Sequence, residues 1–215
     1  MGKLFFYSDQ VVGSPGNRKL DNLLFAGKRA NDIKIGYIPS TVDIEKKYFN
    51  VKSDYYREYG VQNIMFFDLY SEFNPQQMDE LISCDIIHLS AGNPIEFKEA
   101  INKRGMETVL RDYFNNGGTI VGVSGGAVQL GQSSNLFKLF NGVSEDDDSI
   151  ETLKLVDFEF LPHYNRWDEE FKDKVVNYAV TSDTTVYAGN DGDGLIVEDG
   201  VVHTVGDILV MNSKL

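Results

Sequence analysis

The stretch TIVGVSGGA, residues 119–127, contains the pattern that indicates the fold. An almost continuously apolar run, Thr119–Val123, is followed at once by a serine and two glycines. A run of this length and composition is typical of a strand buried on both faces, and the glycines mark a sharp turn into the next element. The stretch therefore predicts a strand–turn–helix unit within a parallel sheet.

The same arrangement repeats along the chain before this stretch. Four more short apolar runs resemble buried strands and lie at Leu4–Tyr7, Ile33–Ile38, Ile64–Phe67 and Ile86–Leu89. Amphipathic helical patterns lie at Ile44 to Tyr59, Pro75 to Ser83 and Glu107 to Phe114. This alternation predicts βαβ units with right-handed crossovers.

The pattern changes in the last third of the chain. Val156–Leu161 predicts another strand, and a helix is expected from Asp168, its cap, to Val180. Farther on, Asp199-Gly200 separates two short apolar runs and predicts a hairpin, because both central residues of such a turn need a positive φ. We therefore expect residues 1–215 to form a single α/β domain with a mostly parallel sheet and an antiparallel C-terminal edge. Ligands bind beyond the carboxyl ends of the strands in such sheets.

Composition excludes several classes of protein. The chain has 215 residues, 42% of them hydrophobic, and 20 basic against 33 acidic side chains give a net charge of −13. An acidic chain is a poor nucleic-acid binder, and no apolar run approaches the roughly 20 residues that span a bilayer. The apolar stretch near the N-terminus is too short for a secretory signal. The lone Cys84 cannot form an internal disulfide, which favours a reducing compartment. We expect a cytoplasmic protein that binds neither nucleic acid nor membrane.

Ser124 is the candidate nucleophile. It is the central residue of Gly122-Val123-Ser124-Gly125-Gly126, which has the pattern G-x-S-x-G directly after a predicted strand. A serine on such a strained turn has its hydroxyl lifted above the sheet, and the next amide, that of Gly125, can face a developing oxyanion. A purely structural turn or a phosphate-binding loop are the alternatives. The strand–turn–helix context favours the nucleophile.

His163 is the candidate general base among only three histidines. It follows the predicted strand that ends at Leu161, which places it at the sheet edge where Ser124 is expected. His88 lies inside a predicted strand and is interpreted as a packed core residue. His203 falls in the C-terminal hairpin, remote from this edge.

Two further segments could complete a site. The loop Ser90–Phe97 follows a predicted strand, and the amide of Gly92 is a candidate second oxyanion donor; the alternative is a plain turn in which Pro94 starts a helix. Arg166 could pair with a substrate carboxylate through a bidentate fork, unless it is a surface arginine of an acidic protein.

The sequence predicts no metal and no organic cofactor. Asp191-Gly192-Asp193-Gly194 has the spacing of a calcium loop, but Gly200 stands where that loop needs a glutamate, so we interpret it as a turn. The chain has no H-E-x-x-H, cysteine pair, P-loop or dinucleotide fingerprint.

Three segments, in this order, resemble the signatures of the peptidase E / cyanophycinase family of serine peptidases: SAGNP at 90–94, GVSGGA at 122–127 and PHY at 162–164. The resemblance extends through Tyr37–Ser40 and Tyr187–Val197 and so spans most of the chain. It implies a three-layer α/β/α fold that is flavodoxin-like and similar to class I glutamine amidotransferases, in a bacterial protein. It also implies cleavage of short peptides, with N-terminal aspartate as a candidate preference.

Carried onto this chain, the resemblance implies Ser124 as nucleophile, His163 as base and an oxyanion hole formed by Gly92 and Gly125. Asn93, in the same glycine loop, is a further candidate for substrate binding. Gly125 replaces the family's usual alanine and Pro94 its threonine, but both oxyanion amides are kept.

The residue that orients the histidine is not evident from the sequence. Family members place an acid about a dozen residues beyond the serine, but residues 132–137 hold no carboxylate. Asn135, or one of the acidic residues among Glu145 to Asp148, could take that role.

We expect a serine peptidase that acts on short peptides as a monomer or homodimer. The alternatives are a catalytically silent relative that acts as a ligand-binding or interaction module, and an esterase or amidase of the same fold.

Overall fold

The computed structural model describes residues 1–141 and 151–212. Its strands are β1 (Lys3–Tyr7), β2 (Lys34–Ile38), β3 (Asn63–Phe66), β4 (Ile86–Leu89), β5 (Thr119–Val123), β6 (Glu159–Leu161), β7 (Val186–Gly189), β8 (Gly194–Glu198), β9 (Val201–Val205) and β10 (Ile208–Met211). Its α-helices are α1 (Pro15–Leu24), α2 (Lys47–Arg57), α3 (Met78–Ile82), α4 (Pro94–Lys103), α5 (Met106–Asn115), α6 (Gly125–Leu130), α7 (Asn135–Asn141) and α8 (Glu169–Thr181). Glu145 to Asp148 lie outside the described residues.

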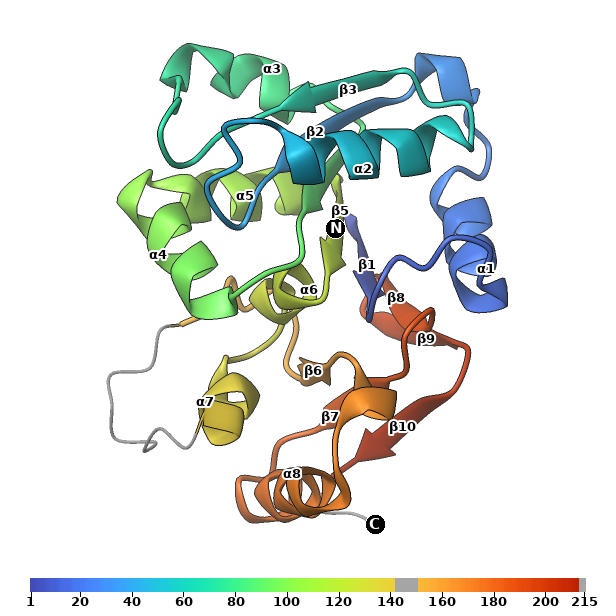
Figure 1. Cartoon of the computed structure of the whole chain (residues 1–215), viewed down its shortest axis with the longest axis vertical. Coiled ribbons are helices and arrows are strands. Elements are labelled where there is room, and N and C mark those ends of the chain that lie inside the picture. The colour runs from blue at the N-terminus through green and yellow to red at the C-terminus, as the bar shows by residue number, and fades with distance from the viewer. Residues whose placement is uncertain (142–150, 213–215) are drawn as a thin grey trace.

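The main sheet has seven strands in the order β3-β2-β4-β5-β1-β8-β9 (Figure 1). The first five are parallel, whereas β8 is antiparallel to β1 and β9 to β8. When β2, β3, β4 and β5 are counted as strands 1 to 4 and β1 as strand 5, the parallel strands have the order 2-1-3-4-5 of a doubly wound sheet. At the β8–β9 turn, Asp199 and Gly200 have φ values of 51° and 76°. The predicted mostly parallel sheet and its antiparallel C-terminal edge are confirmed.

Strand β1 shows why the sheet carries helices on both faces. Leu4 and Phe6 belong to the hydrophobic core that includes buried residues of α4 and α5. Their neighbours Phe5 and Tyr7 belong to a second core, with buried residues of α1 and α2. Because side chains alternate along a strand, this apolar run fills both cores at once. The three-layer α/β/α arrangement expected from the resemblance is confirmed.

A second, smaller sheet has the order β10-β7-β6 and lies below the main sheet in Figure 1. Strand β6 is parallel to β7, with Glu159 opposite Val186, and β10 is antiparallel to β7. Buried residues of α7 and α8 pack against it. The sequence did not predict this sheet. The strand expected from Val156 begins only at Glu159.

The helices that were predicted differ from the structure mainly at their ends. The stretch from Pro75 to Ser83 divides into a 3₁₀ turn, Pro75–Gln77, and α3. Asp168 caps α8 as predicted, since its Oδ1 accepts a hydrogen bond from the N–H of Phe171 at 2.8 Å. Helix α1 was not predicted, although Ser14 caps it and Pro15 begins it. Within the described residues, every helix is too short or too polar to cross a bilayer.

Candidate active site

Ser124 lies on the turn between β5 and α6, in a backbone conformation that few residues other than glycine adopt. Its φ is 50° and its ψ −115°, and its N–H donates to the carbonyl of Tyr7 at 2.9 Å. Gly122, two residues before Ser124, lets α6 approach β5 closely, because a Cβ there would lie 2.7 Å from the Cα of Ala127. A strained residue held by its surroundings at a strand end is a common feature of catalytic turns.

The two glycine loops that the sequence singled out are in direct backbone contact. A Cβ at Gly125 would lie 1.9 Å from the carbonyl oxygen of Gly92, so the close approach of the two loops in this chain requires glycine at this position. The Gly125 N–H is the first of α6 and has no acceptor within that helix. Across residues 1–141 and 151–212, the Gly92 N–H also lacks a backbone acceptor. Both amides are therefore available beside Ser124.

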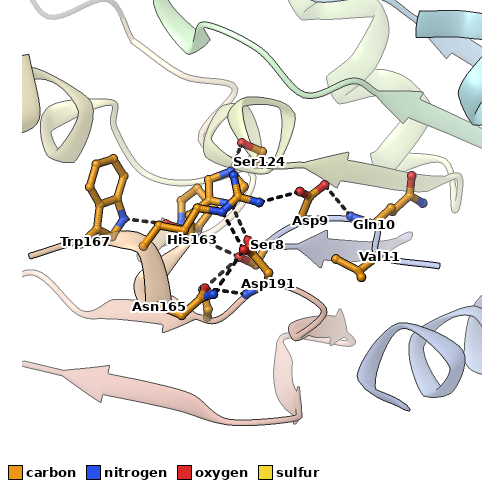
Figure 2. Close-up of polar contacts among 12 residues, drawn as sticks. Ser8, Asp9, Gln10, Val11, Ser124, His163, Asn165, Trp167 and Asp191 are labelled. Carbon is orange, nitrogen blue, oxygen red and sulfur yellow. Dashed lines mark hydrogen bonds and ion pairs between the residues drawn. The ribbon is translucent and has the colours of Figure 1, made fainter. Parts of the chain in front are cut away.

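His163 directly faces Ser124 (Figure 2). The Ser124 hydroxyl lies 2.8 Å from Nε2 of the imidazole. The backbone of His163 is left-handed, with φ 61°, and its N–H donates to Oγ of Ser8 at 2.7 Å. The Ser8 hydroxyl donates in turn to the carbonyl of Gly189 at 2.9 Å. The buried Ser8 thus ties the ends of β1, β6 and β7 together around the imidazole.

Asp191, in the loop after β7, binds the other ring nitrogen. Its Oδ1 lies 2.6 Å from Nδ1 of His163, and its Oδ2 accepts from Nε of Arg166 at 2.6 Å and from Asn165 at 3.2 Å. Burial pushes the pKa of this carboxyl upward, but the hydrogen bonds from His163, Arg166 and Asn165 outweigh it and hold the pKa below its ordinary value. An ionised carboxylate only accepts, so Nδ1 carries the proton and Nε2 accepts from Ser124.

Comparison with known proteins places the chain in a family. The model of peptidase family S51 matches residues 5–205, nearly the whole chain. The chain belongs to peptidase family S51. No curated protein sequence matches this S51 peptidase family member significantly.

Two solved structures show the same fold as this S51 family member. A protein assigned to peptidase E from Listeria monocytogenes has a TM-score of 0.76 at 19% identity, covering 95% of this chain and 98% of its own. A peptidase from an acI-B1 actinobacterium has a TM-score of 0.74 at 15% identity, covering 99% of this chain and 91% of its own. At these identities the likeness concerns the fold alone.

In this S51 family member, the structure brings Ser124 and His163 together as predicted, and Asp191 rather than the candidate Asn135 lies on the second ring nitrogen of His163. Asn135 is directed away, and its Nδ2 donates to the hydroxyl of Tyr178 at 3.3 Å. Asp191 was interpreted from sequence only as part of a turn. Its position depends on β7 pairing parallel to β6, because parallel strands bring Asp191 and His163 to the same edge. Asp191 follows its apolar run by two residues, as His163 follows the run that ends at Leu161, and this position was the available signal.

Two candidates for substrate binding, Arg166 and Asn93, form hydrogen bonds with other groups of the protein. Arg166 donates to Asp191 and, through Nη2, to Asp9 at 3.0 Å, so its guanidinium is already neutralised by carboxylates. Asn93 caps α4, and its Oδ1 accepts from the N–H of Ile95 at 2.9 Å. Both side chains are therefore hydrogen-bonded within the protein.

A metal ion is poorly suited to this cluster. One ligand atom each of Asp9, His163 and Asp191 lie within 4.8 Å of one another, which is a spacing that an ion could use. Arg166 donates to both carboxylates, and His163 already binds Asp191 and Ser124. The guanidinium thus supplies the positive charge that a metal would supply elsewhere.

Proposed function

We propose that this family S51 chain is a serine peptidase with Ser124 as nucleophile, His163 as general base and Asp191 as the group that orients the imidazole. The observation that carries the proposal is the unbroken hydrogen-bond path from Ser124 Oγ through His163 to Asp191, at 2.8 and 2.6 Å. Nucleophile, base and orienting carboxylate within hydrogen-bond reach are the geometric signature of this chemistry.

The reaction uses the groups in sequence. Ser124 Oγ forms a bond to the scissile carbonyl carbon while its proton passes to Nε2 of His163, and the resulting oxyanion accepts from the N–H groups of Gly92 and Gly125. The carbon–nitrogen bond then breaks as His163 gives that proton to the leaving amine. Water attacks the acyl-enzyme by the same route: Nε2 accepts its proton and returns it to Ser124, which releases the acid.

Short peptides are the proposed substrates, on the strength of family membership together with this site. The expected preference for an N-terminal aspartate needs a local cation, because a net charge of −13 repels acidic substrates at long range. Arg166 was the candidate for that cation. Its pairing with Asp9 and Asp191 leaves the preference without that support.

A fluorophosphonate probe tests the nucleophile directly. We expect covalent labelling of the wild-type protein, its loss in Ser124→Ala, and full labelling of Ser83→Ala, which removes an exposed serine hydroxyl. A panel of dipeptides, assayed by release of free amino acids, is expected to be hydrolysed with the same dependence on Ser124. Folded protein that is not labelled would refute the peptidase and leave the silent binding module.

The amidase and esterase alternative is separated by matched substrates. If Ser124-dependent turnover occurs with esters but with none of the dipeptides, the chemistry of the site is retained and the peptide substrate is wrong. The main argument for a silent relative was the lack of a carboxylate after Ser124, and Asp191 supplies a carboxylate from another part of the chain.

A further inference from the structure

An apolar cavity opens directly beside Ser124. Its walls come from the turn that carries the serine and Gly125, from α6 and α7, and from the segment around His163. The side chains that shape it are Val128, Leu136, Phe137, Phe140, Leu161 and Trp167. Resting on the proposed function, we propose that this cavity selects substrates with an apolar or aromatic side chain next to the scissile bond, rather than aspartate.

An aromatic cluster forms one wall of the cavity. The ring of Phe140 lies 4.6 Å from that of Trp167 and 5.6 Å from that of Phe171, centroid to centroid. The indole N–H of Trp167 already donates to the carbonyl of Pro162 at 2.9 Å, so the ring offers only carbon to a ligand. Phe140 is nonetheless 49% exposed. Exposed aromatic surface beside a reactive group is typical of a binding surface for apolar groups.

Charge near the site disfavours a substrate carboxylate. Within the described part of the chain, the cavity walls contain neither lysine nor arginine. Figure 2 shows Trp167 on one side of His163 and Asp9 on the other, so the acidic group lies away from the aromatic wall. Arg166, Asp9 and Asp191 together carry a net negative charge. A carboxylate that entered the cavity would lose its water without gaining a cation, whereas an apolar side chain would gain burial.

Two boronic acids that differ only in their substituent test the preference. Boron takes the place of the scissile carbon and binds Ser124 as a tetrahedral adduct, so affinity is read from the slowing of fluorophosphonate labelling. We expect 2-phenylethylboronic acid to bind at least about tenfold more tightly than 2-carboxyethylboronic acid. Equal or tighter binding of the carboxyethyl compound would overturn the inference while leaving the nucleophile established. Absence of any labelling would instead overturn the proposed function, and the inference with it.

A charge placed in the cavity provides the matched test. Phe140→Lys puts a cation on the aromatic wall at a half-exposed position, and we expect it to reduce the preference for the phenylethyl compound by about tenfold or more. Val180→Lys makes the same change of net charge at an exposed residue of α8 that is not among those lining the cavity, and should leave the ratio unchanged. If Phe140→Lys and Val180→Lys give the same ratio as wild type, the cavity does not set the preference and the assignment is wrong.

Discussion

Asp191 and Asp21 are two aspartates near strand β1 whose carboxyl groups have opposite pKa shifts. Asp191 accepts from the cationic Arg166 as well as from His163 and Asn165, and its pKa lies below the ordinary value. Asp21, on α1, is fully buried and accepts from the hydroxyls of Tyr7 at 2.9 Å and Tyr55 at 2.5 Å.

Burial raises the pKa of the Asp21 carboxyl, and the tyrosine hydrogen bonds only partly offset it. Both carboxyls have several hydrogen-bond donors, so the number of donors does not decide the direction. A cationic partner and partial access to water keep the pKa of Asp191 low, whereas burial in a dry core raises the pKa of Asp21 by more than its hydroxyl donors lower it.

The two histidines near these aspartates have different surroundings. His163 lies between Ser124 and a carboxylate. His88, on β4, is completely buried, and its Nδ1 lies 2.7 Å from the hydroxyl of Tyr56. Burial holds the pKa of His88 well below its ordinary value, so it stays neutral. It was predicted to be a packed core residue, and its complete burial confirms this.

Replacing each histidine is expected to give the largest difference in activity between the site around Asp191 and the buried cluster around Asp21. His163→Gln removes the base, and we expect kcat/KM to fall by roughly 10⁴- to 10⁶-fold with little change in Tm. His88→Gln should lower Tm, because it disturbs a buried hydrogen bond, and should leave kcat/KM within a few-fold. Steady-state kinetics and thermal unfolding of both variants are the measurement. A comparable loss of activity in His88→Gln would show that the buried cluster takes part in the reaction.

Replacing each of the two aspartates should give the next largest difference in activity. Asp191→Asn lets the amide donate where the carboxylate accepted, which disfavours the tautomer that Ser124 needs, and kcat is expected to fall by about 10⁴-fold. Asp21→Asn leaves these atoms untouched and should change kcat by no more than a few-fold. Single-turnover rates with the same dipeptide compare the two. If Asp191→Asn stays near wild-type activity, another group orients the imidazole.

Sequence reasoning succeeded where a feature is encoded locally. Strands β4 and β5 were predicted with their correct bounds, because their apolar runs end abruptly at polar or glycine-rich turns. Ser124 and His163 were predicted to lie close together because both follow strands, and the 2.8 Å contact confirms their proximity. The single sheet edge on which that prediction placed them was wrong, because β5 belongs to the main sheet and β6 to the smaller one.

Features that depend on distant pairing were missed. The parallel pairing of β6 with β7 leaves no mark in either segment, so Asp191 was seen only as a turn residue. The guanidinium of Arg166 likewise donates hydrogen bonds to Asp191 and Asp9, which are 25 and 157 positions away along the chain. Periodicity predicts which face a side chain occupies, but not which remote partner it meets.

Replacing Arg166 tests a smaller and more specific effect, the contribution of this arginine to the lowered pKa of Asp191. A lowered pKa means that Asp191 contributes stability fully above its ordinary pKa, near 4, and loses it as pH falls through the lower folded value. Arg166→Gln removes one cause of that lowering and is expected to reduce the free energy of unfolding at pH 7 by at most about 1 kcal/mol, since the arginine is half exposed.

The difference between wild type and Arg166→Gln should begin to shrink as the pH falls below about 4, and it should disappear once the pH is below the lowered pKa of Asp191, where the carboxyl is protonated in both folded proteins. Urea unfolding between pH 3 and 7 measures it. Arg57→Gln, which breaks an exposed pair with Asp54 within α2, is the control and should show little pH-dependent change. A constant difference across this range would mean that Arg166 does not act through the ionisation of Asp191.

Asp21 should show the opposite dependence on pH, and the effect is the smallest of those expected. Because its folded pKa is raised, its contribution to stability is complete below its ordinary pKa and is lost as pH rises through the folded value. Asp21→Asn removes this titration, so the variant should gain stability relative to wild type between pH 4 and 7. The change is expected to be on the order of the 1 kcal/mol typical of single substitutions. Urea unfolding across that range measures it, and a wild-type protein that instead gains on the variant with rising pH would show that Asp21 is ionised and favourably paired, as Asp191 is.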